Sequence, residues 1–322
     1  MSASETTTDA RPRDLSRRLT LFGIVAMAIG GGFVVVGLLS PVVAWVFRLR
    51  PEEQAVDWGS SFMGLLLYVA LGVVMIWAGL GSVRRRRWVR PIMLFVSGTW
   101  LFVGAFCLLL ALWIDVEDLL LAFGSQSLAP APEIVLFVRV FLIGASFLGG
   151  LVLPAAFFWA YRDPRVQTTC ELHDPLPSWS DRCPTTVLAM SVALFAAAVL
   201  GLPLVIRPVV PIFGFLATGW AGAAALLVGM ALCLWLARST YRLERIGWWG
   251  TLVFLILLGV SALWSSLRIE SIEIYRHLGY PESQLDVLER SGMLAPAPMV
   301  WGTVILTILG VAYMLAIRHH FK

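Results

Sequence analysis

The sequence predicts an all-α polytopic membrane protein with eight transmembrane helices, built as two tandem four-helix repeats in parallel orientation. Of its 322 residues, 59% are apolar and only 14% are charged, against about 25% charged in an ordinary soluble domain. The mean hydropathy is +0.84. A water-soluble protein cannot bury that much apolar surface. The composition therefore excludes soluble enzymes, disordered chains and fibrous proteins.

Eight apolar runs are long enough to cross the hydrocarbon core, which takes about 20 helical residues. We expect the spans near Leu19–Leu39, Ser61–Leu80, Ile92–Ile114, Ile134–Trp159, Thr186–Ile206, Ile212–Ala237, Gly247–Trp264 and Met299–Ile317. The first run carries no cleavage pattern of a signal peptide, so we expect it to remain part of the protein.

The placement of basic residues predicts the orientation. With the N-terminus inside, 17 of the 24 basic residues fall in inner segments and six in outer ones, as the positive-inside rule requires. Both termini are then cytoplasmic in a bacterial-type inner membrane, and the net charge of +4 needs no nucleic-acid partner. The predicted parts are an N-terminal tail (1–18), a first repeat (19–161), a cytoplasmic linker (162–184), a second repeat (185–317) and a C-terminal tail (318–322).

Matching residues in the two halves predict the duplication. The segment Leu128–Pro132 recurs as Leu294–Pro298, each just before a fourth span. Four residues recur at a constant offset of 158: Gly64, Trp77, Arg84 and Arg87 match Gly222, Trp235, Arg242 and Arg245. Because each half has an even number of spans, both insert the same way up. An interface between the halves is then the natural place for a pore or ligand site.

Short amphipathic helices are predicted in the outer loops, at Asp115–Phe123 and at Pro281–Arg290. Each has leucines on one side and carboxylates on the other, which is typical of a helix lying at the membrane surface. The longer loop, 265–298, is a candidate docking surface for a protein partner outside the membrane. A plain re-entry turn without a ligand is the alternative.

The predicted spans lack the residues that membrane chemistry usually requires. They hold no Asp, Glu or His, which argues against proton- or sodium-coupled carriers and against a bis-histidine haem. The sequence also lacks a Walker motif, His-Glu-x-x-His and Gly-x-Ser-x-Gly. We therefore expect no catalytic residue and no cofactor.

Arg139 is the only formal charge inside a predicted span. It lies five residues below the outer boundary, about 8 Å at 1.5 Å per residue, and an arginine can snorkel that far to the interface. The alternative is a contact with an anion or a lipid headgroup, or a pair with Glu133 or Asp118.

The linker holds three soft metal ligands, Cys170, His173 and Cys183. Their spacing, Cys-x2-His-x9-Cys, matches no strong zinc pattern, so they are weak metal candidates, and an ordered linker without metal is favoured. Cys170, His173 and Asp174 are also the only candidate polar cluster for the active site of a lipid-modifying enzyme.

The run Arg84, Arg85, Arg86 and Arg87 is mainly a determinant of topology, with the anionic headgroups of the lipid bilayer as an expected contact.

The function that these observations favour is a non-enzymatic, structural, accessory or partner-binding membrane component. The alternative is a transporter or channel for a neutral or weakly anionic solute, with its path between the two repeats. A wide cavity lined by Ser97, Thr99, Ser146 or Thr218 favours transport, and a close-packed centre favours the membrane component.

Overall fold

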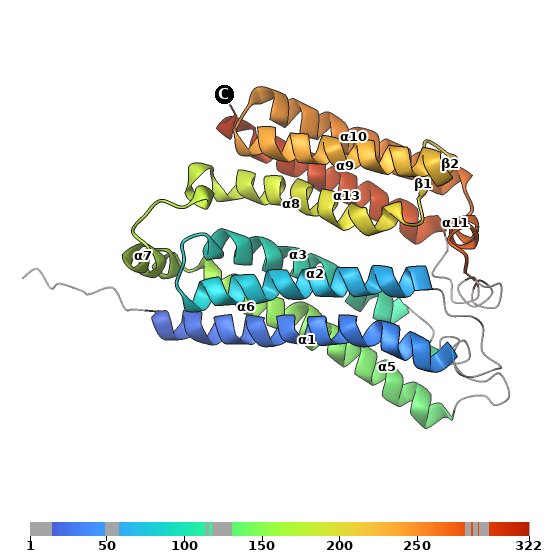
Figure 1. Ribbon diagram of the computed structural model, residues 1–322, viewed down its shortest axis with the longest axis horizontal. Helices are drawn as coiled ribbons and strands as arrows, with labels where there is room; N and C mark the ends of the chain where they lie inside the picture. The colour runs from blue at the N-terminus through green and yellow to red at the C-terminus, as the bar shows by residue number, and fades with distance from the viewer. Residues whose placement is uncertain are drawn as a thin grey trace, which may run out of the picture.

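The computed structural model describes residues 15–48, 58–113, 116–117, 131–280, 285, 289 and 296–321. Within this part of the chain, eight helices are long and apolar enough to cross a membrane. They indicate a multi-pass integral membrane protein. The starts of α1 and α7 and the end of α13 lie at one end of the bundle, which we call the linker end, and α11 lies at the other, which we call the loop end (Figure 1).

The first half contains four spans, and the linker follows it. Its helices are α1 (Ser16–Arg48), α2 (Trp58–Val83), α3 (Val89–Trp113), α5 (Pro132–Phe147), the π-helical η1 (Leu148–Val152) and α6 (Leu153–Arg162), and the linker follows with α7 (Pro164–His173) and η2 (Trp179–Arg182). Helices α5, η1 and α6 together form the fourth span, Pro132–Arg162.

The second half contains the other four spans. Its elements are α8 (Thr185–Gly201), η3 (Leu202–Val205), β1 (Val209–Ile212), β2 (Phe215–Thr218), α9 (Gly219–Tyr241), α10 (Arg245–Arg268), α11 (Ser271–His277), α13 (Pro296–Ala316) and η4 (Arg318–His320). The short helix α11 was not expected from the sequence. Most of the two predicted loop helices, Asp115–Phe123 and Pro281–Arg290, lies outside the described residues.

The prediction that the sixth span begins at Ile212 is wrong, and the fold is not entirely helical. Strands β1 and β2 form an antiparallel hairpin, and the span starts only at Gly219. Phe213 and Gly214 at the turn have φ of 46° and 81°, the positive values that a two-residue hairpin turn needs. Branched residues and Pro211 disfavour helix in this apolar run.

Helices α1 and α2 pack closely because glycines face one another along the contact. A Cβ on Gly30 would lie 2.7 Å from the carbonyl oxygen of Gly72, and one on Gly79 would lie 2.6 Å from that of Gly23. Small residues let two helix backbones approach in a membrane, where no hydrophobic effect drives helices together. These four glycines therefore determine the first hairpin of the bundle.

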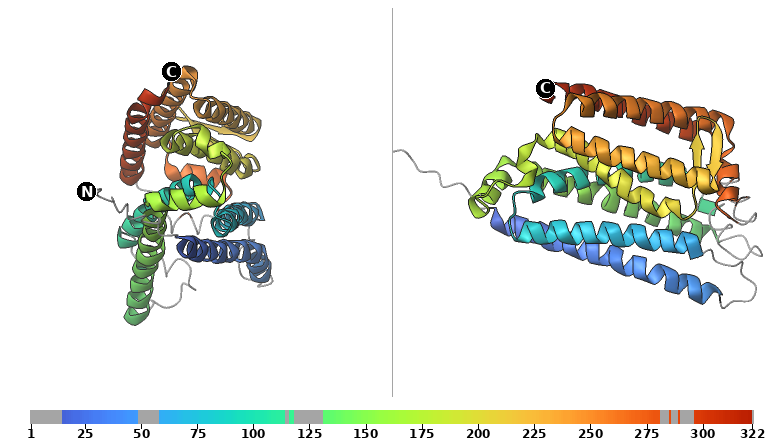
Figure 2. Two further views of the ribbon diagram at one scale, coloured as in Figure 1. Left: turned by 90° about the vertical axis from the view of Figure 1, so that its left-hand side faces the viewer. Right: turned by 45° about the horizontal axis from the view of Figure 1, so that its top comes forward.

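The two halves lie side by side (Figure 2), and each has its own core. The first core includes Met93, Phe157 and Tyr161, and the second includes Trp248 and Met314. In both halves the first span packs on the second and the third packs on the fourth. Helix α3 meets α8 where the halves join.

The turns α2–α3 and α9–α10 have the same hydrogen bonds. Arg85 and Leu243, 158 positions apart, adopt the left-handed conformation, with φ of 55° and 61°. In the first turn, the backbone N–H groups of Arg84, Arg85 and Arg86 donate to the carbonyls of Leu80, Ser82 and Gly81, respectively. In the second turn, those of Arg242, Leu243 and Glu244 donate to the carbonyls of Arg238, Thr240 and Ser239. Every donor and acceptor in the second set lies 158 positions after its counterpart.

The fourth span of the first half departs from regular α-helix at η1. Pro154 has no N–H to donate to the carbonyl of Gly150, and the ladder widens just before it, with the Leu153 N–H donating to Leu148. A Cβ on Gly104 of α3 would overlap the Gly150 backbone. Beyond this contact α5 extends away from the bundle (Figures 1 and 2).

Candidate functional site

The linker forms a short polar helix at one end of the bundle (Figure 1). Helix α7 begins where the carboxylate of Asp163 accepts a hydrogen bond of 2.9 Å from the Arg165 N–H, with Pro164 at the first helical position. Val166 and Cys170 are buried against the first half. The linker is therefore part of the first core.

Arg87 binds the end of α7. Its side chain donates to the backbone carbonyls of Asp174 and, at 3.4 Å, Glu171, and lies 3.9 Å from the Asp181 carboxylate. Its own N–H donates to the Asp174 carboxylate at 3.4 Å, and Arg86 lies 3.5 Å from the same group. These two arginines bind the protein itself, a role that the predicted headgroup contact did not include.

The other two arginines of the run, Arg84 and Arg85, do not bind α7, and their environments differ. Arg84 is exposed, so the expected headgroup contact remains a prediction for it. Arg85 has a buried Nε that makes no hydrogen bond to the described residues.

Arg90 and Ser82 hold the end of α6. The Nε of Arg90 donates to the Tyr161 carbonyl at 3.2 Å, and its Nη1 donates to Gln167 at 2.7 Å. The buried hydroxyls of Ser82 and Tyr161 share a hydrogen bond of 2.5 Å. In the second half Trp248, 158 positions after Arg90, donates its ring N–H to the Met314 carbonyl at 2.7 Å. In both halves, a side chain near the start of the third span thus fastens the end of the fourth.

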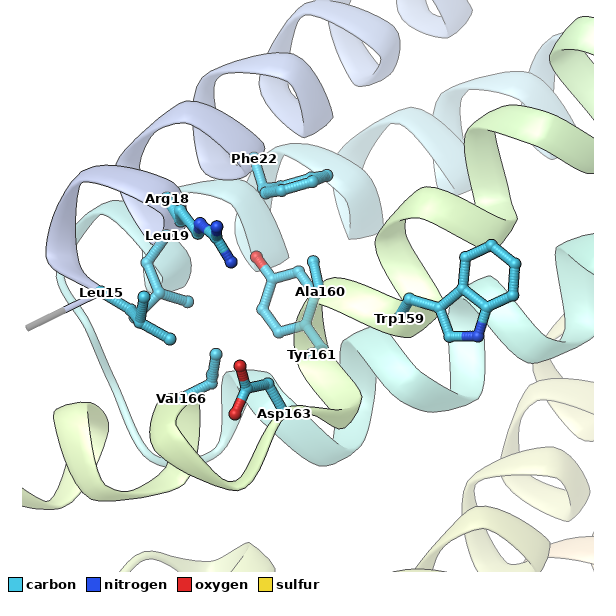
Figure 3. Close-up of a pocket in the computed structure, with 9 residues that line it drawn as sticks. All are labelled: Leu15, Arg18, Leu19, Phe22, Trp159, Ala160, Tyr161, Asp163 and Val166. Atoms are coloured by element: carbon cyan, nitrogen blue, oxygen red, sulfur yellow. The ribbon is translucent and has the colours of Figure 1, made fainter. Parts of the chain in front are cut away.

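A cavity of about 40 Å³ lies between the start of α1 and the end of α6. Figure 3 shows the carboxylate of Asp163 and the ring of Tyr161 at this cavity, with the guanidinium of Arg18 near the Tyr161 hydroxyl. Because one water needs about 10–15 Å³ measured in this way, the space holds about three waters. It is too small for an organic substrate.

The three candidate metal ligands of the linker have separate environments. Cys170 and Cys183 are buried, and burial raises the pKa of each thiol to about 11. His173 is exposed, and its Nδ1 lies 2.9 Å from the Thr169 carbonyl oxygen. Among the described residues, no three His, Cys, Asp or Glu side chains group as a metal site. Asp174, the third residue considered for a lipid-modifying enzyme, has its carboxylate bound by Arg86 and Arg87.

A second cavity is an open groove of about 540 Å³ between α8 and α9. Its walls are mainly apolar, with Leu188, Val192 and Phe195 on α8 and Leu234 on α9. Phe195 lies ten residues into α8, so the groove reaches a point about 15 Å along the helix from its first residue, at 1.5 Å per residue. The groove was not predicted from the sequence, because an apolar groove on two apolar helices leaves no pattern there.

The polar end of the groove is formed by Trp179, Arg238 and Tyr241. The Tyr241 hydroxyl donates to the Trp179 carbonyl at 2.7 Å, and the Ser191 hydroxyl donates to the Ala237 carbonyl at 2.8 Å. These two bonds fix the linker and α8 against α9. The Arg238 side chain is exposed and makes no hydrogen bond or ion pair with any residue that the structure describes.

Arg139 lies on the part of the fourth span that leaves the bundle. Helix α5 has no buried residue, and its exposed side chains include Phe137 and Phe141 at 70% and 63%. Arg139 is also exposed, and it pairs neither with Glu133 nor with any other described residue. Asp118, the other carboxylate considered, is outside the described residues.

At the loop end, two serines of α10 hold the unexpected hairpin. Ser261 and Ser265 accept hydrogen bonds of 3.0 Å from the backbone N–H groups of Phe213 and Gly214. Their spacing of four puts both hydroxyls on one helix face. The spacing of the two serines is visible in the sequence, but it indicates a contact only once the position of the hairpin is known. Phe215 and Trp220 are 77% and 93% exposed beside it.

The four residues proposed for a path between the repeats are dispersed. Ser97 is buried and donates to the Met93 carbonyl of its own helix at 2.6 Å. Thr99 and Thr218 are exposed, and Ser146 is half-buried. None of the four lines either cavity described above.

The comparisons with known proteins add no further identification. No family model matches the sequence. No curated protein and no solved structure matches it significantly.

Proposed function

We propose that this protein is a partner-binding component of a bacterial-type plasma membrane, and that α5 binds the partner inside the bilayer. The observation that carries the proposal is Arg139, an exposed charge that pairs with none of the described residues and lies on a helix with no buried residue. Charged side chains in membrane helices usually face a protein interior and have a partner there. A partner helix would bury this face of α5 and neutralise the charge.

The partner that fits is a membrane helix of another protein with an acidic residue at the depth of Arg139. The predicted spans of this chain hold no Asp or Glu, so a second copy would not supply that carboxylate. A guanidinium and a carboxylate form strong, bidentate hydrogen bonds, and these gain strength in a medium of low dielectric constant.

The proposed architecture is two like-oriented repeats with both termini cytoplasmic. The identical hydrogen bonds of the turns α2–α3 and α9–α10 support a duplication. The outer loop 265–298 remains a second candidate contact, for a partner outside the membrane, and Arg84 remains a candidate for anionic headgroups.

Photo-crosslinking in living cells tests the α5 surface. A photoreactive phenylalanine replaces Phe137 on α5, and the matched control replaces Val253, which is 48% exposed on α10. We expect one adduct of defined mass from Phe137 and none from Val253. The substitution Arg139→Leu should abolish that adduct while leaving the amount of protein in the membrane unchanged.

Three outcomes contradict the proposal. Equal adducts from both positions indicate random collision in the membrane. An adduct of twice the mass of this chain indicates a second copy. An adduct that persists in Arg139→Leu means that the arginine only snorkels to the interface. Transport of a solute has less support, because neither cavity lies along a path between the repeats.

A further inference from the structure

The groove between α8 and α9 combines two features that no proposed partner contact uses. Its walls are apolar, with Leu188 buried at the base and Phe195 and Leu234 exposed at the rim, and its end at the linker carries Arg238. Apolar walls below a single cation match an amphipathic anion, with its chain in the bilayer and its charge at the interface.

The charge of Arg238 has no counterpart in the described protein. Some other arginines at the linker end have carboxylate partners, such as Arg87 with Asp181 and Arg242 with Glu244 at 3.8 Å. Arg238 makes no such bond. A guanidinium binds a phosphate through two parallel N–H donors, and phosphate is the anionic group of bilayer lipids.

The groove is held in shape before anything binds. Ser191 ties α8 to the Ala237 carbonyl of α9, and Tyr241 fastens Trp179 over the polar end. A site that needs little reordering loses less free energy on binding. The first half has no equivalent, because Leu80 occupies the position of Arg238 158 residues earlier.

We propose that the α8–α9 groove is a binding site for one anionic phospholipid. Its phosphate lies on the guanidinium of Arg238, and one acyl chain lies against Leu188, Val192, Phe195 and Leu234. This proposal is independent of the α5 partner, since the two sites share no residue.

Native mass spectrometry of the delipidated full-length protein tests the site. Phosphatidylglycerol and phosphatidylcholine with identical chains are added in turn, the first anionic and the second neutral. We expect preferential binding of one phosphatidylglycerol, and a loss of affinity of about tenfold or more in Arg238→Gln, since hydrogen bonds to charged groups are among the strong ones. The matched control is Arg165→Gln, which removes an exposed arginine of α7 at the same end.

A second variant keeps the charge and fills the groove. Leu234→Trp should also weaken phosphatidylglycerol binding, so the test does not depend on one substitution. Equal binding of the two lipids, or equal loss in Arg238→Gln and Arg165→Gln, overturns the proposal. Competition by inorganic phosphate at the concentration of the lipid also overturns it, because the acyl chain would then contribute nothing.

Discussion

At the scale of single residues, arginines determine more of this structure than their role in topology requires. Arg87 and Arg90 bind carbonyls of the linker and of α6, more than 70 positions along the chain. A guanidinium has five N–H donors in a fixed plane and can satisfy several acceptors at a helix end. The basic run was evident from the sequence, but its acceptors were not, because backbone carbonyls carry no sequence signal.

The buried thiols of the linker give a prediction about reactivity. With a pKa of about 11, about one Cys170 or Cys183 thiol in a thousand is ionised at pH 8, and only the thiolate reacts. A cysteine at exposed Thr168 of α7, with a pKa near its ordinary value of 9.0, is about a tenth ionised at that pH. We expect maleimide to label Thr168→Cys rapidly and the two native thiols slowly, measured by peptide mass spectrometry.

The pH dependence has a definite sign. Folding raises the thiol pKa of Cys170 from its ordinary value of 9.0, so the protonated thiol favours the folded state. This contribution is fully present below pH 9 and is lost as the pH rises towards 11. Labelling of Cys170 as fast as that of Thr168→Cys at pH 8 would mean that α7 does not bury this thiol.

At the scale of elements, the contact between α1 and α2 depends on glycine. A leucine at Gly72 places its Cβ 2.6 Å from the Gly30 carbonyl oxygen and forces the two helices apart. Overpacking of this kind costs about 1–3 kcal/mol, so we expect Gly72→Leu to lower the midpoint of thermal unfolding in detergent.

The matched control for that prediction is Gly32→Leu on α1, where an added Cβ meets nothing within 4 Å. It should leave the unfolding midpoint unchanged or raise it slightly, because leucine favours helix over glycine. The same fall in both variants would mean that the close approach of the two helices is not what stabilises the pair.

The eight spans were predictable because bilayer thickness fixes their length and composition, and the β1–β2 hairpin was not. Residues 209–218 are apolar and extend a span without a break, so hydropathy alone includes them in it. The hairpin forms because Gly214 permits its turn and because Ser261 and Ser265, about 50 residues later, bind the turn amides. Such a long-range contact leaves no local pattern.

At the scale of the whole molecule, the start of α1, the linker and the end of α13 lie at one end of the bundle, so we expect them on one side of the membrane. We expect a membrane-impermeant maleimide to label Phe215→Cys, in the hairpin, on intact cells. It should label Thr168→Cys, in the linker, only after permeabilisation. The reverse pattern would place the linker outside, and labelling of both on intact cells would contradict the eight-span topology.

The groove and the isolation of α5 could not be predicted from the sequence, because both depend on how whole helices diverge. The sequence offset of 158 predicted that Arg84 and Arg242 occupy equivalent positions, and the turns at these residues have the same hydrogen bonds. It gave no indication that the fourth span of the first half would run for 31 residues and bend away.

The π-helical turn at Leu148–Val152 has a consequence for how this span can change. One residue inserted into a helix turns everything beyond it by about 100° around the axis. The inner part, with Phe157 and Tyr161 in the core, is therefore offset in rotation from the outer part that carries Arg139, and the outer part has no buried residue. Mutations can alter the outer surface for a new recognition task without disturbing the buried aromatic residues below it.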